Sequence, residues 1–378
     1  MGQPIDKITV KGFKSIRSLE NFPLRPLNIL IGANGAGKSN FVDFFRLLGA
    51  MASESLQKFI LQQGGGDGFL FMGPQYTPLM AVRLEFGKNT YEFSLVPTAS
   101  AELIFDEHHI HCDGGSEAGG ATYSAPKGTR EAALRGPRDK ETEFASFQAR
   151  LIDILGLNIH GVISGWVVYH FHDTSMHANI RRPRTVRDNE YLRPDAANLG
   201  AYLLMLRDRH QNVYEKIRDT VRLAAPFFDD FKFRPKPSNG DQMLHLEWTQ
   251  RGSDYPFLVT QLSDGTLRFI ALTTALLQPD PPATILLDEP ELGLHPYALT
   301  LLAELLKKAT EKTQVNVSTQ SASLLDNFEA EDVIVVEREN GASTFKRLAS
   351  ADLEEWLKDY SLGELWEKNI FGGRPSNG

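Results

Sequence analysis

A glycine-rich octapeptide near the N-terminus constrains the fold more than any other part of the sequence. It runs from Gly32 to Ser39 and matches the pattern G-x-x-x-x-G-K-[ST] at every required position. The apolar segment Leu27 to Ile31 precedes it, and phenylalanines at helical spacing follow it. In this strand–turn–helix context the glycines let the backbone wrap around phosphate groups, and the first N–H groups of the helix point at them. The pattern therefore predicts a phosphate-binding loop after a buried strand.

The residue types in this loop predict how it would hold a nucleoside triphosphate. Lys38 is expected to bridge the β- and γ-phosphates and to assist catalysis, and the Ser39 hydroxyl is expected to bind Mg²⁺. The predicted ligands are ATP and Mg²⁺. The residues predicted to contact ATP are Gly32, Asn34, Gly35, Ala36, Gly37, Lys38, Ser39 and Asn40.

A second apolar segment ends in two acids, Asp288 and Glu289. A buried strand delivers such residues to the carboxyl edge of an α/β sheet, where these folds place their chemistry. Asp288 is expected to bind Mg²⁺, and Glu289 to orient or deprotonate an attacking water. Taken alone, the pair is equally compatible with surface acids in a turn before Pro290. Beside the phosphate loop, it predicts ATP hydrolysis.

Lys38 and Asp288 are much further apart in sequence than a simple phosphate-loop domain requires. We therefore expect an α/β P-loop fold, a mixed-sheet ATPase core interrupted by a helical and loop insertion. The expected division is 1–98 for the first half of the core, 99–225 for the insertion and 226–378 for the second half with a helical tail.

Apolar spacing also predicts two long helices and one irregular segment. One continuous helix is expected over 39–60 and another over 198–223, with a further helical stretch around 144–155. The segment 114–136 is rich in glycine and small residues without a period, which is typical of a loop.

Composition narrows the functional class. The formal net charge of −8 argues against a protein that is basic as a whole and binds nucleic acid everywhere. Cys112 is the only cysteine, so an internal disulfide is excluded, as expected for a reducing cytoplasm. No apolar run approaches the ~20 residues of a membrane helix, and no secretory signal is evident. A cytoplasmic protein without a membrane partner is the expectation.

The segment Leu262 to Thr266 resembles the signature loop of ATP-binding-cassette ATPases. The resemblance implies that Ser263 and Gly265 contact the γ-phosphate bound by an opposing subunit, so ATP would join a head-to-tail homodimer. A serine hydroxyl, a glycine N–H and a helix N-terminus all favour an anion. An ordinary N-capped helix explains the same residues, and both interpretations can hold together.

Two further segments resemble parts of the same superfamily. Glu291 to Pro296 resembles the D-loop that crosses the dimer interface, and Ser318 to Ser321 occupies the switch position. Most relatives carry histidine where this chain has Gln320, which we assign a catalytic role. An amide can hydrogen-bond a phosphate oxygen but carries no proton near neutral pH, so slow or partner-gated turnover is expected. The Q-loop glutamine has no clear counterpart. The candidates are Gln62, Gln63 and Gln75.

Nearly the whole chain resembles the RecF-like, AAA-21-type ATPases of bacteria, relatives of SMC, RecF and the overcoming-lysogenisation-defect nucleases. The segments that carry this resemblance are ITVKGFKSI, LNILIGANGAGKSN, ELGLHP, STQSASLLD and YSLGELW. The resemblance implies a DNA-linked role in repair or anti-phage defence. Since no metal-binding nuclease motif follows the switch segment, a separate effector such as a nuclease is expected. The alternative is a nucleotide-gated scaffold that regulates a protein partner without touching DNA. A transporter subunit is poorly supported.

Two weaker clusters remain open. A basic stretch could contact a phosphate backbone, or could be a solvated loop or pair with acids across the dimer. Its candidate DNA contacts are Arg181, Arg182, Arg184 and Arg187. His170, His172 and Asp173 invite a metal site, but a structural or nucleotide-proximal role is the better-supported interpretation. Phe13 is expected to be buried in the first strand rather than to stack on the adenine.

Overall fold

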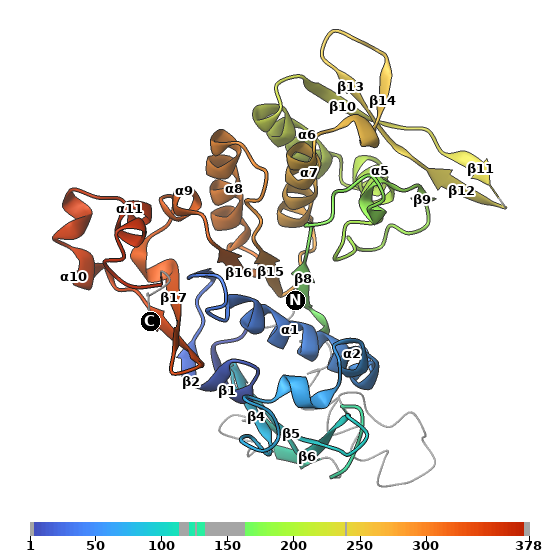
Figure 1. Cartoon of the computed structure of the whole chain (residues 1–378). Helices are drawn as coiled ribbons and strands as arrows, with labels where there is room; N and C mark the ends of the chain where they lie inside the picture. The colour runs from blue at the N-terminus through green and yellow to red at the C-terminus, as the bar shows by residue number, and fades with distance from the viewer. Residues whose placement is uncertain (1–3, 113–120, 125–126, 133–162, 239, 374–378) are drawn as a thin grey trace.

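Two six-stranded sheets and a layer of helices make up the protein (Figure 1). The structure, a computed structural model, describes residues 4–112, 121–124, 127–132, 163–238 and 240–373. Among these residues, no helix is long and apolar enough to cross a membrane.

The central sheet has the strand order β18-β17-β3-β16-β15-β8, and only β18 runs antiparallel to its neighbour. Layers cover both faces, so β3, β15 and β16 are buried almost throughout. The strands are β3 (Leu27–Ile31), β8 (Trp166–Tyr169), β15 (Thr284–Asp288), β16 (Gln314–Thr319), β17 (Val333–Glu339) and β18 (Ala342–Arg347).

The second sheet is antiparallel, with the order β2-β1-β4-β5-β6-β7. Buried and exposed residues alternate along β1 and β4, so one face of the sheet turns to the core and the other to solvent. Phe13 at the end of β1 is fully buried, as predicted. The strands are β1 (Lys7–Phe13), β2 (Ile16–Pro23), β4 (Met80–Phe86), β5 (Asn89–Pro97), β6 (Leu103–Cys112) and β7 (Ala121–Ser124).

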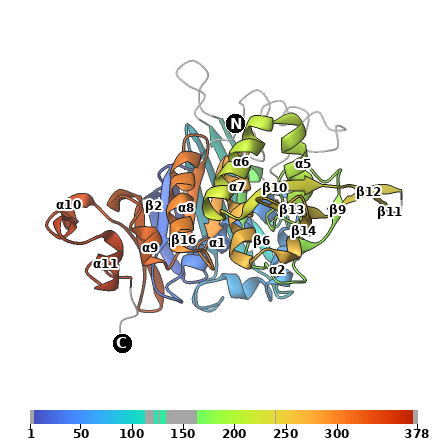
Figure 2. The same ribbon diagram turned by 90° about the horizontal axis from the view of Figure 1, so that it is seen from above.

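Helix α1 (Lys38–Ala52) lies between the two sheets. Its phenylalanines share one hydrophobic cluster with the antiparallel sheet and with Leu30, Leu286 and Ile334 of the central sheet. Other helices pack on the opposite face of the central sheet, where a second cluster includes Ile285 and Val317 (Figures 1 and 2). These helices are α5 (Leu199–Arg209), α6 (Gln211–Ala224), α7 (Asp264–Leu277) and α8 (Pro296–Ala309).

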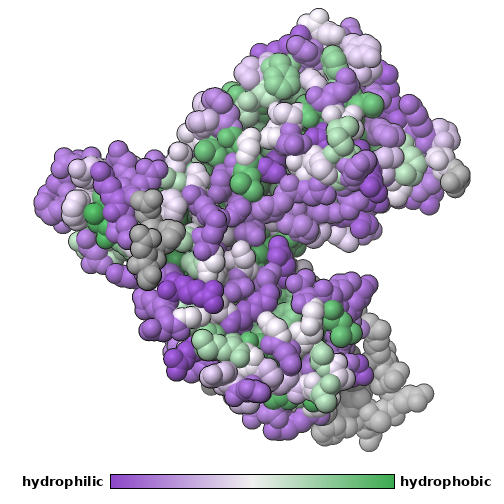
Figure 3. All heavy atoms as spheres, in the orientation of Figure 1, coloured by the Kyte–Doolittle hydropathy of each residue, from purple (hydrophilic) through white to green (hydrophobic). Residues whose placement is uncertain are grey.

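Smaller elements decorate this frame. Two three-stranded sheets join β10 (Phe228–Phe233), β13 (Leu246–Gln250) and β14 (Pro256–Leu258), and β11 (Lys236–Ser238), β12 (Asp241–Leu244) and β9 (Arg184–Thr185). The short helices are α2 (Leu56–Gln62), α9 (Ala322–Leu325), α10 (Ser350–Leu353) and α11 (Leu362–Glu367). In the orientation of Figure 1 the surface is mostly hydrophilic and is hollowed between the lobe that carries α5 and the lobe that carries α2 (Figure 3).

Both long helices predicted from apolar spacing are interrupted. The helix expected over 39–60 is divided because Ser53 bonds its hydroxyl back to Gly49 O and Ala50 O and Glu54 adopts a positive φ of 54°. The helix expected over 198–223 ends at Arg209, and a new one begins at Gln211, because His210 between them leaves helical geometry. Apolar spacing continues across both breaks, so it could not reveal them.

The segment 99–225 holds strands as well as helices. β6 pairs with β5 across residue 98, and β8 forms the edge of the central sheet beside β15. Both large sheets therefore extend into the segment that the sequence assigned to the insertion. The helix expected around 144–155 and most of the expected loop over 114–136 lie outside the described residues.

Candidate nucleotide-binding site

The glycine-rich loop joins β3 to α1, as its pattern predicts. Gly37 caps the helix with a φ of 118°, a left-handed conformation that favours glycine. Asn34, Gly35 and Ser39 are exposed, so the mouth of the loop is open to a ligand. The loop thus presents the N-terminus of a fifteen-residue helix, with its unpaired N–H groups, at an accessible edge of the central sheet.

Close backbone approaches explain two of the glycines. A Cβ atom at Gly32 would lie well inside 3.0 Å of Val336 O in β17, and one at Gly37 would overlap the hydroxyls of Ser343 and Ser15. Those hydroxyls are 2.6 Å apart, and Ser343 Oγ donates to Ala36 O at 2.6 Å. The loop is therefore braced by β17, β18 and the turn after β1.

Asn40, a predicted ATP contact, also takes part in this bracing. Its amide Nδ2 donates to Ser15 Oγ at 2.6 Å. The structure gives Asn40 a role in holding the loop, and its contact with ATP stays a prediction.

Lys38 is buried within its own loop. Its Nζ donates to Gly32 O at 2.5 Å and to Ala33 O at 3.2 Å. Burial lowers the pKa of Lys38, while the nearby charges of Glu289, Asp288 and Glu291 act in the opposite direction. The P-loop lysine and the acidic group therefore share one electrostatic neighbourhood, the arrangement that a phosphate with a bound cation would enter.

The acidic pair stands at the carboxyl end of β15. Asp288 is the last residue of the strand, directly beside Ser318 of β16. Glu289 takes a φ of 42°, which is unusual for a non-glycine residue, and its N–H is held by Ser318 O at 2.7 Å. The residues present fit Mg²⁺: the Ser39 hydroxyl and the Asp288 carboxylate are oxygen donors, the type that this ion prefers.

The switch residue Gln320 reaches the acidic pair. Its Nε2 donates to Glu289 Oε1, so the amide touches the carboxylate that is predicted to act on water. Glu291, which the sequence placed only in the D-loop, accepts from Thr319 Oγ1 at 2.6 Å and from Gln320 N at 3.0 Å. Burial raises its pKa. The only feature of the sequence that could have indicated this contact is the position of Glu291, two residues after Glu289.

The signature segment forms the start of α7. Ser263 is the N-cap and accepts from Thr266 N at 3.2 Å, which confirms the helix-cap interpretation. Gly265 lies against the D-loop, because a Cβ atom there would fall well inside 3.0 Å of Gly293 O. A cavity of about 120 Å³ beside this contact is lined by residues of both loops and of α6. The signature loop and the D-loop of one chain are thus in direct backbone contact.

Two buried arginines surround the signature loop. Arg181 Nη1 donates to Val259 O at 2.7 Å and its Nη2 to Asp264 Oδ1 at 2.7 Å. With a side chain only 3% exposed, Arg181 cannot touch DNA, and its proposed DNA contact is wrong. Instead of facing solvent or a nucleic acid, this residue points inward and donates to carbonyl oxygens and to Asp264. Arg268 in α7 was missed, although it is the only charged residue between Asp264 and the end of an apolar helix.

The other arginines of the basic stretch differ among themselves. Arg182 is exposed, whereas Arg184 is half-buried and donates to Asn179 Oδ1 at 3.2 Å. Arg187 is exposed and lies 3.6 Å from a carboxylate oxygen of Asp241. Acids within the chain therefore neutralise part of the stretch.

His170 directly follows β8, an edge strand of the central sheet. Leu287 pairs with Tyr169, the last residue of β8, and the N–H of His170 then donates to Pro194 O at 3.0 Å. Burial lowers the pKa of His170. Gln62 and Gln63 lie at the end of α2 and Gln75 lies before β4, so none of the Q-loop candidates ends a parallel strand. Among the described residues, no group of three or more His, Cys, Asp or Glu side chains is arranged to hold a metal ion.

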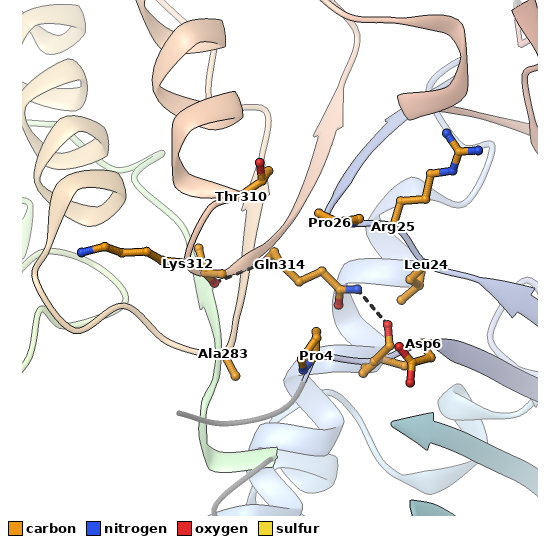
Figure 4. Close-up of a pocket in the computed structure, with 11 residues that line it drawn as sticks. Pro4, Asp6, Leu24, Arg25, Pro26, Ala283, Thr310, Lys312 and Gln314 are labelled. Carbon is orange, nitrogen blue, oxygen red and sulfur yellow. Dashed lines mark hydrogen bonds between the residues drawn. The ribbon is translucent and has the colours of Figure 1, made fainter. Parts of the chain in front are cut away.

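A cavity of about 230 Å³ lies at the other end of the parallel strands (Figure 4). Its lining includes Pro26 before β3, Ala283 before β15 and Gln314 at the start of β16, and the Gln314 amide donates to Ile5 O at 2.8 Å. None of the residues predicted to bind ATP or Mg²⁺ lines it. The residues predicted to bind ATP and Mg²⁺ therefore lie at the opposite edge of the sheet from this cavity.

Comparisons with known proteins agree with this geometry. The family described as "AAA domain, putative AbiEii toxin, Type IV TA system" matches residues 27–326, well over half of the chain. No curated protein matches the chain.

Solved structures that resemble the chain include heads of SMC proteins. An SMC head bound to the C-winged helix domain of ScpA has a TM-score of 0.54 and 16% identity, over 94% of this chain and 99% of that one. The Smc head with an extended coiled coil, bound to the C-terminal domain of ScpA from Pyrococcus furiosus, has a TM-score of 0.50 and 14% identity, over 94% and 98%. At these identities the likeness establishes the fold alone, an α/β P-loop fold of the ATP-binding-cassette type.

Proposed function

The chain belongs to the AAA-21 family of AbiEii-type AAA domains, and on that premise we propose that it binds and hydrolyses ATP with Mg²⁺ in a head-to-tail dimer. One observation carries the proposal: the buried Lys38 ammonium, after β3, lies within the field of three carboxylates at and just after the end of β15 in the same sheet. A bound γ-phosphate with its cation resolves that arrangement, because the phosphate takes over the lysine donors and the cation neutralises the acids.

In the proposed site each residue has a separate task. Lys38 leaves its two carbonyl partners and binds the β- and γ-phosphates, while Ser39 and Asp288 hold Mg²⁺, which supplies charge neutralisation when bound. Glu289 orients the attacking water and accepts its proton. Gln320 keeps the Glu289 carboxylate in place through the hydrogen bond described above. Since an amide cannot relay a proton, turnover is slow or activated by a partner.

His170 takes the position of the missing Q-loop glutamine in this proposal. It directly follows the carboxyl end of β8, the strand that pairs with β15, and the chain continues from it to the Phe171 and His172 carbonyl oxygens held by Arg268.

The second half of the site comes from another copy. Ser263 and Gly265 would face the γ-phosphate bound by the opposing chain, with the N-terminus of α7 behind them. Beside them Leu292 and Tyr297 are 40% and 54% exposed, apolar surface that a second copy would cover. We also propose that the chain divides into a first half of the core (1–98), an insertion (99–225) and a second half of the core with a helical tail (226–378). The strands β6, β7 and β8 of the middle range pair with the two large sheets.

The biological role that we propose is control of a separate effector, such as a nuclease, in a DNA-linked process. The second candidate is regulation of a protein partner without DNA contact. The inward-facing Arg181 and the pairing of Arg187 with Asp241 favour the second candidate. Duplex binding measured with Arg182→Ala and Arg187→Ala together separates the two, because phosphate contacts would make the loss of affinity salt-dependent.

The test of the ATPase is hydrolysis by the purified chain, with and without duplex DNA. Lys38→Ala is expected to lose ATP binding and turnover, whereas Glu289→Gln is expected to keep binding and lose turnover. In Glu289→Gln, ATP should also convert monomers to dimers in sedimentation velocity. Wild-type chain that neither binds nor hydrolyses ATP would refute the proposal, and an unchanged assembly would refute the dimer.

A further inference from the structure

We propose that Arg268 is a positioning residue that joins the signature loop and the D-loop of one chain into a single face, presented to the nucleotide held by a second copy. The inference rests on the proposed ATP-dependent dimer and adds to it a residue that acts on the opposing site.

The contacts of Arg268 reach two segments outside its own helix. Its Nε donates to Phe171 O at 2.9 Å and its Nη2 to His172 O at 3.0 Å. Its Nη1 donates to Leu292 O in the D-loop. One guanidinium one turn after the signature loop therefore ties α7 to the D-loop and to the segment that follows β8.

The chemistry of these partners explains why the residue is an arginine. All three are backbone carbonyl oxygens, and a planar fork of N–H groups can satisfy them together, which a single ammonium cannot do in the same geometry. Burial lowers the pKa of Arg268, while the charges of Asp264 and Glu291 oppose that shift. An apolar side chain would fill the space at less desolvation cost, so the guanidinium is retained for the orientation that it imposes.

The backbones of the two loops already touch beneath this side chain. A Cβ atom at Gly265 would overlap Gly293 O, and one at Gly293 would lie 3.3 Å from Arg268 Nη1. The glycines permit the close approach, and Arg268 fixes the relative placement of the loops across it. Arg181 also holds the signature loop, through Leu262 O at 3.3 Å and Asp264 Oδ1 at 2.7 Å, and its Nε donates to Thr174 O at 2.7 Å.

The proposed role predicts that two inactive variants complement each other in a mixed dimer. If Arg268 orients the face shown to the second copy, its loss damages the site completed by the other chain and spares ATP binding by its own P-loop. A heterodimer of Arg268→Met with Lys38→Ala then contains one site with an intact P-loop and an intact signature face, and another with neither.

The experiment measures steady-state ATP hydrolysis of each variant alone and of an equal mixture. Arg268→Met alone should lower kcat by about 10- to 100-fold and change the affinity for ATP by less than about 3-fold. Mixing with Lys38→Ala should restore about a quarter of the wild-type rate, because half of the random dimers carry one complete site. Arg268→Lys should fall between wild type and Arg268→Met.

Arg347→Met is the control for loss of a half-buried arginine that bonds to backbone oxygens away from the site. Arg347 likewise donates to backbone oxygens, Glu331 O at 2.9 Å and Pro23 O at 3.0 Å, but lies at the far side of the central sheet on β18. It should lose stability and keep kcat.

The outcomes separate the inference from the proposal beneath it. Activity of wild type together with no rescue in the mixture would overturn the role of Arg268 and leave the ATPase intact. A wild-type chain that neither hydrolyses ATP nor assembles with it would overturn both. If Arg347→Met lowers kcat to the same extent, the effect of Arg268→Met reflects a loss of stability, and the positioning role of Arg268 is overturned.

Discussion

The phosphate loop and the signature loop are two anion-facing turns of one chain, and they are held in place by different forces. The phosphate loop is braced by backbone contacts at Gly32 and by the neutral hydroxyls of Ser15 and Ser343, while its one cation bonds its own carbonyl oxygens. The signature loop is held by two buried guanidinium groups, Arg181 and Arg268, on carbonyl oxygens and one carboxylate.

The difference indicates which half of the site rearranges on binding. Two of the three N–H donors of Lys38 are already bonded to carbonyl oxygens, so a phosphate that binds more than one of them must displace such an oxygen. The arginines beside the signature loop bond mainly to backbone carbonyl oxygens of their own chain, so they can keep these partners whether or not a phosphate is present. We therefore expect the phosphate loop to exchange hydrogen bonds on ATP binding and the signature loop to meet the nucleotide already formed.

The largest difference between the phosphate loop and the signature loop is expected when Gly32 or Gly265 is replaced by alanine. In Gly32→Ala the new methyl group meets Val336 O in the buried central sheet, and we expect a loss of about 3 kcal/mol in the free energy of unfolding. In Gly265→Ala the methyl meets Gly293 O on an exposed loop that can shift, and the gain of about 1 kcal/mol in helix propensity offsets the strain. Urea unfolding measures both values.

The same pair also separates folding from function. Gly265→Ala should fold like wild type and still lose ATP hydrolysis, because the displaced D-loop no longer aligns with the second copy. Equal losses of stability in the two variants would contradict the distinction between a glycine packed against the buried central sheet and one packed against an exposed loop.

Removing a cation from each half gives the next largest contrast. Lys38→Met should weaken ATP binding about 100-fold, close to 2.7 kcal/mol, since charge-assisted bonds to phosphate are lost. Arg181→Met should change ATP affinity by less than about 3-fold, because Arg181 touches only the signature side of the chain. Calorimetric titration with Mg-ATP in the Glu289→Gln background provides the comparison, and a similar loss in both variants would contradict it.

The phosphate half was the easier of the two to predict from sequence. The motif from Gly32 to Ser39 and the acids 288–289 are local patterns whose chemistry follows from a few adjacent residues, and the structure sets them at one edge of the central sheet. The bracing by Ser343 was not predictable, because more than three hundred positions separate it from Ser15 and neither hydroxyl belongs to a motif.

The signature half shows why long-range satisfaction of polar groups escapes pattern analysis. Arg181 stood in a run of arginines, which is typical of a solvated or nucleic-acid-binding surface, yet it turns inward to Val259 and Asp264. Whether an arginine is exposed depends on unpaired carbonyl oxygens elsewhere in the fold, and a linear sequence does not reveal where those are. The apolar spacing along 198–223 likewise continued through His210, although the helix does not.

A smaller effect is expected where a neutral hydroxyl braces the phosphate loop. Ser343→Ala removes the donor to Ala36 O and should cost about 1–1.5 kcal/mol of unfolding free energy, with a lower affinity for ATP. Thr344→Ala on the exposed face of the same strand is the control and should cost less than about 0.5 kcal/mol. A Ser343→Ala variant as stable as Thr344→Ala would mean that glycine contacts alone hold the loop.

The smallest effect concerns the acid that lies between the two halves. Burial raises the pKa of Glu291 above its ordinary value of 4.5, although bonds from Thr319 and Gln320 act against the shift. The native chain therefore binds more protons at this site than the unfolded chain, so stability falls as pH rises from the unfolded pKa through the raised native one. Glu291→Gln abolishes this titration while its amide oxygen can still accept from Thr319.

Thermal unfolding across pH provides the measurement for Glu291→Gln. Its stability relative to wild type should increase as pH rises from about 4 and then level off above the native pKa of Glu291. A relative stability that decreases with rising pH would mean that the carboxylate is held by the switch strand more strongly than its burial disfavours it. In that case the D-loop, like the signature loop, would be anchored by charge.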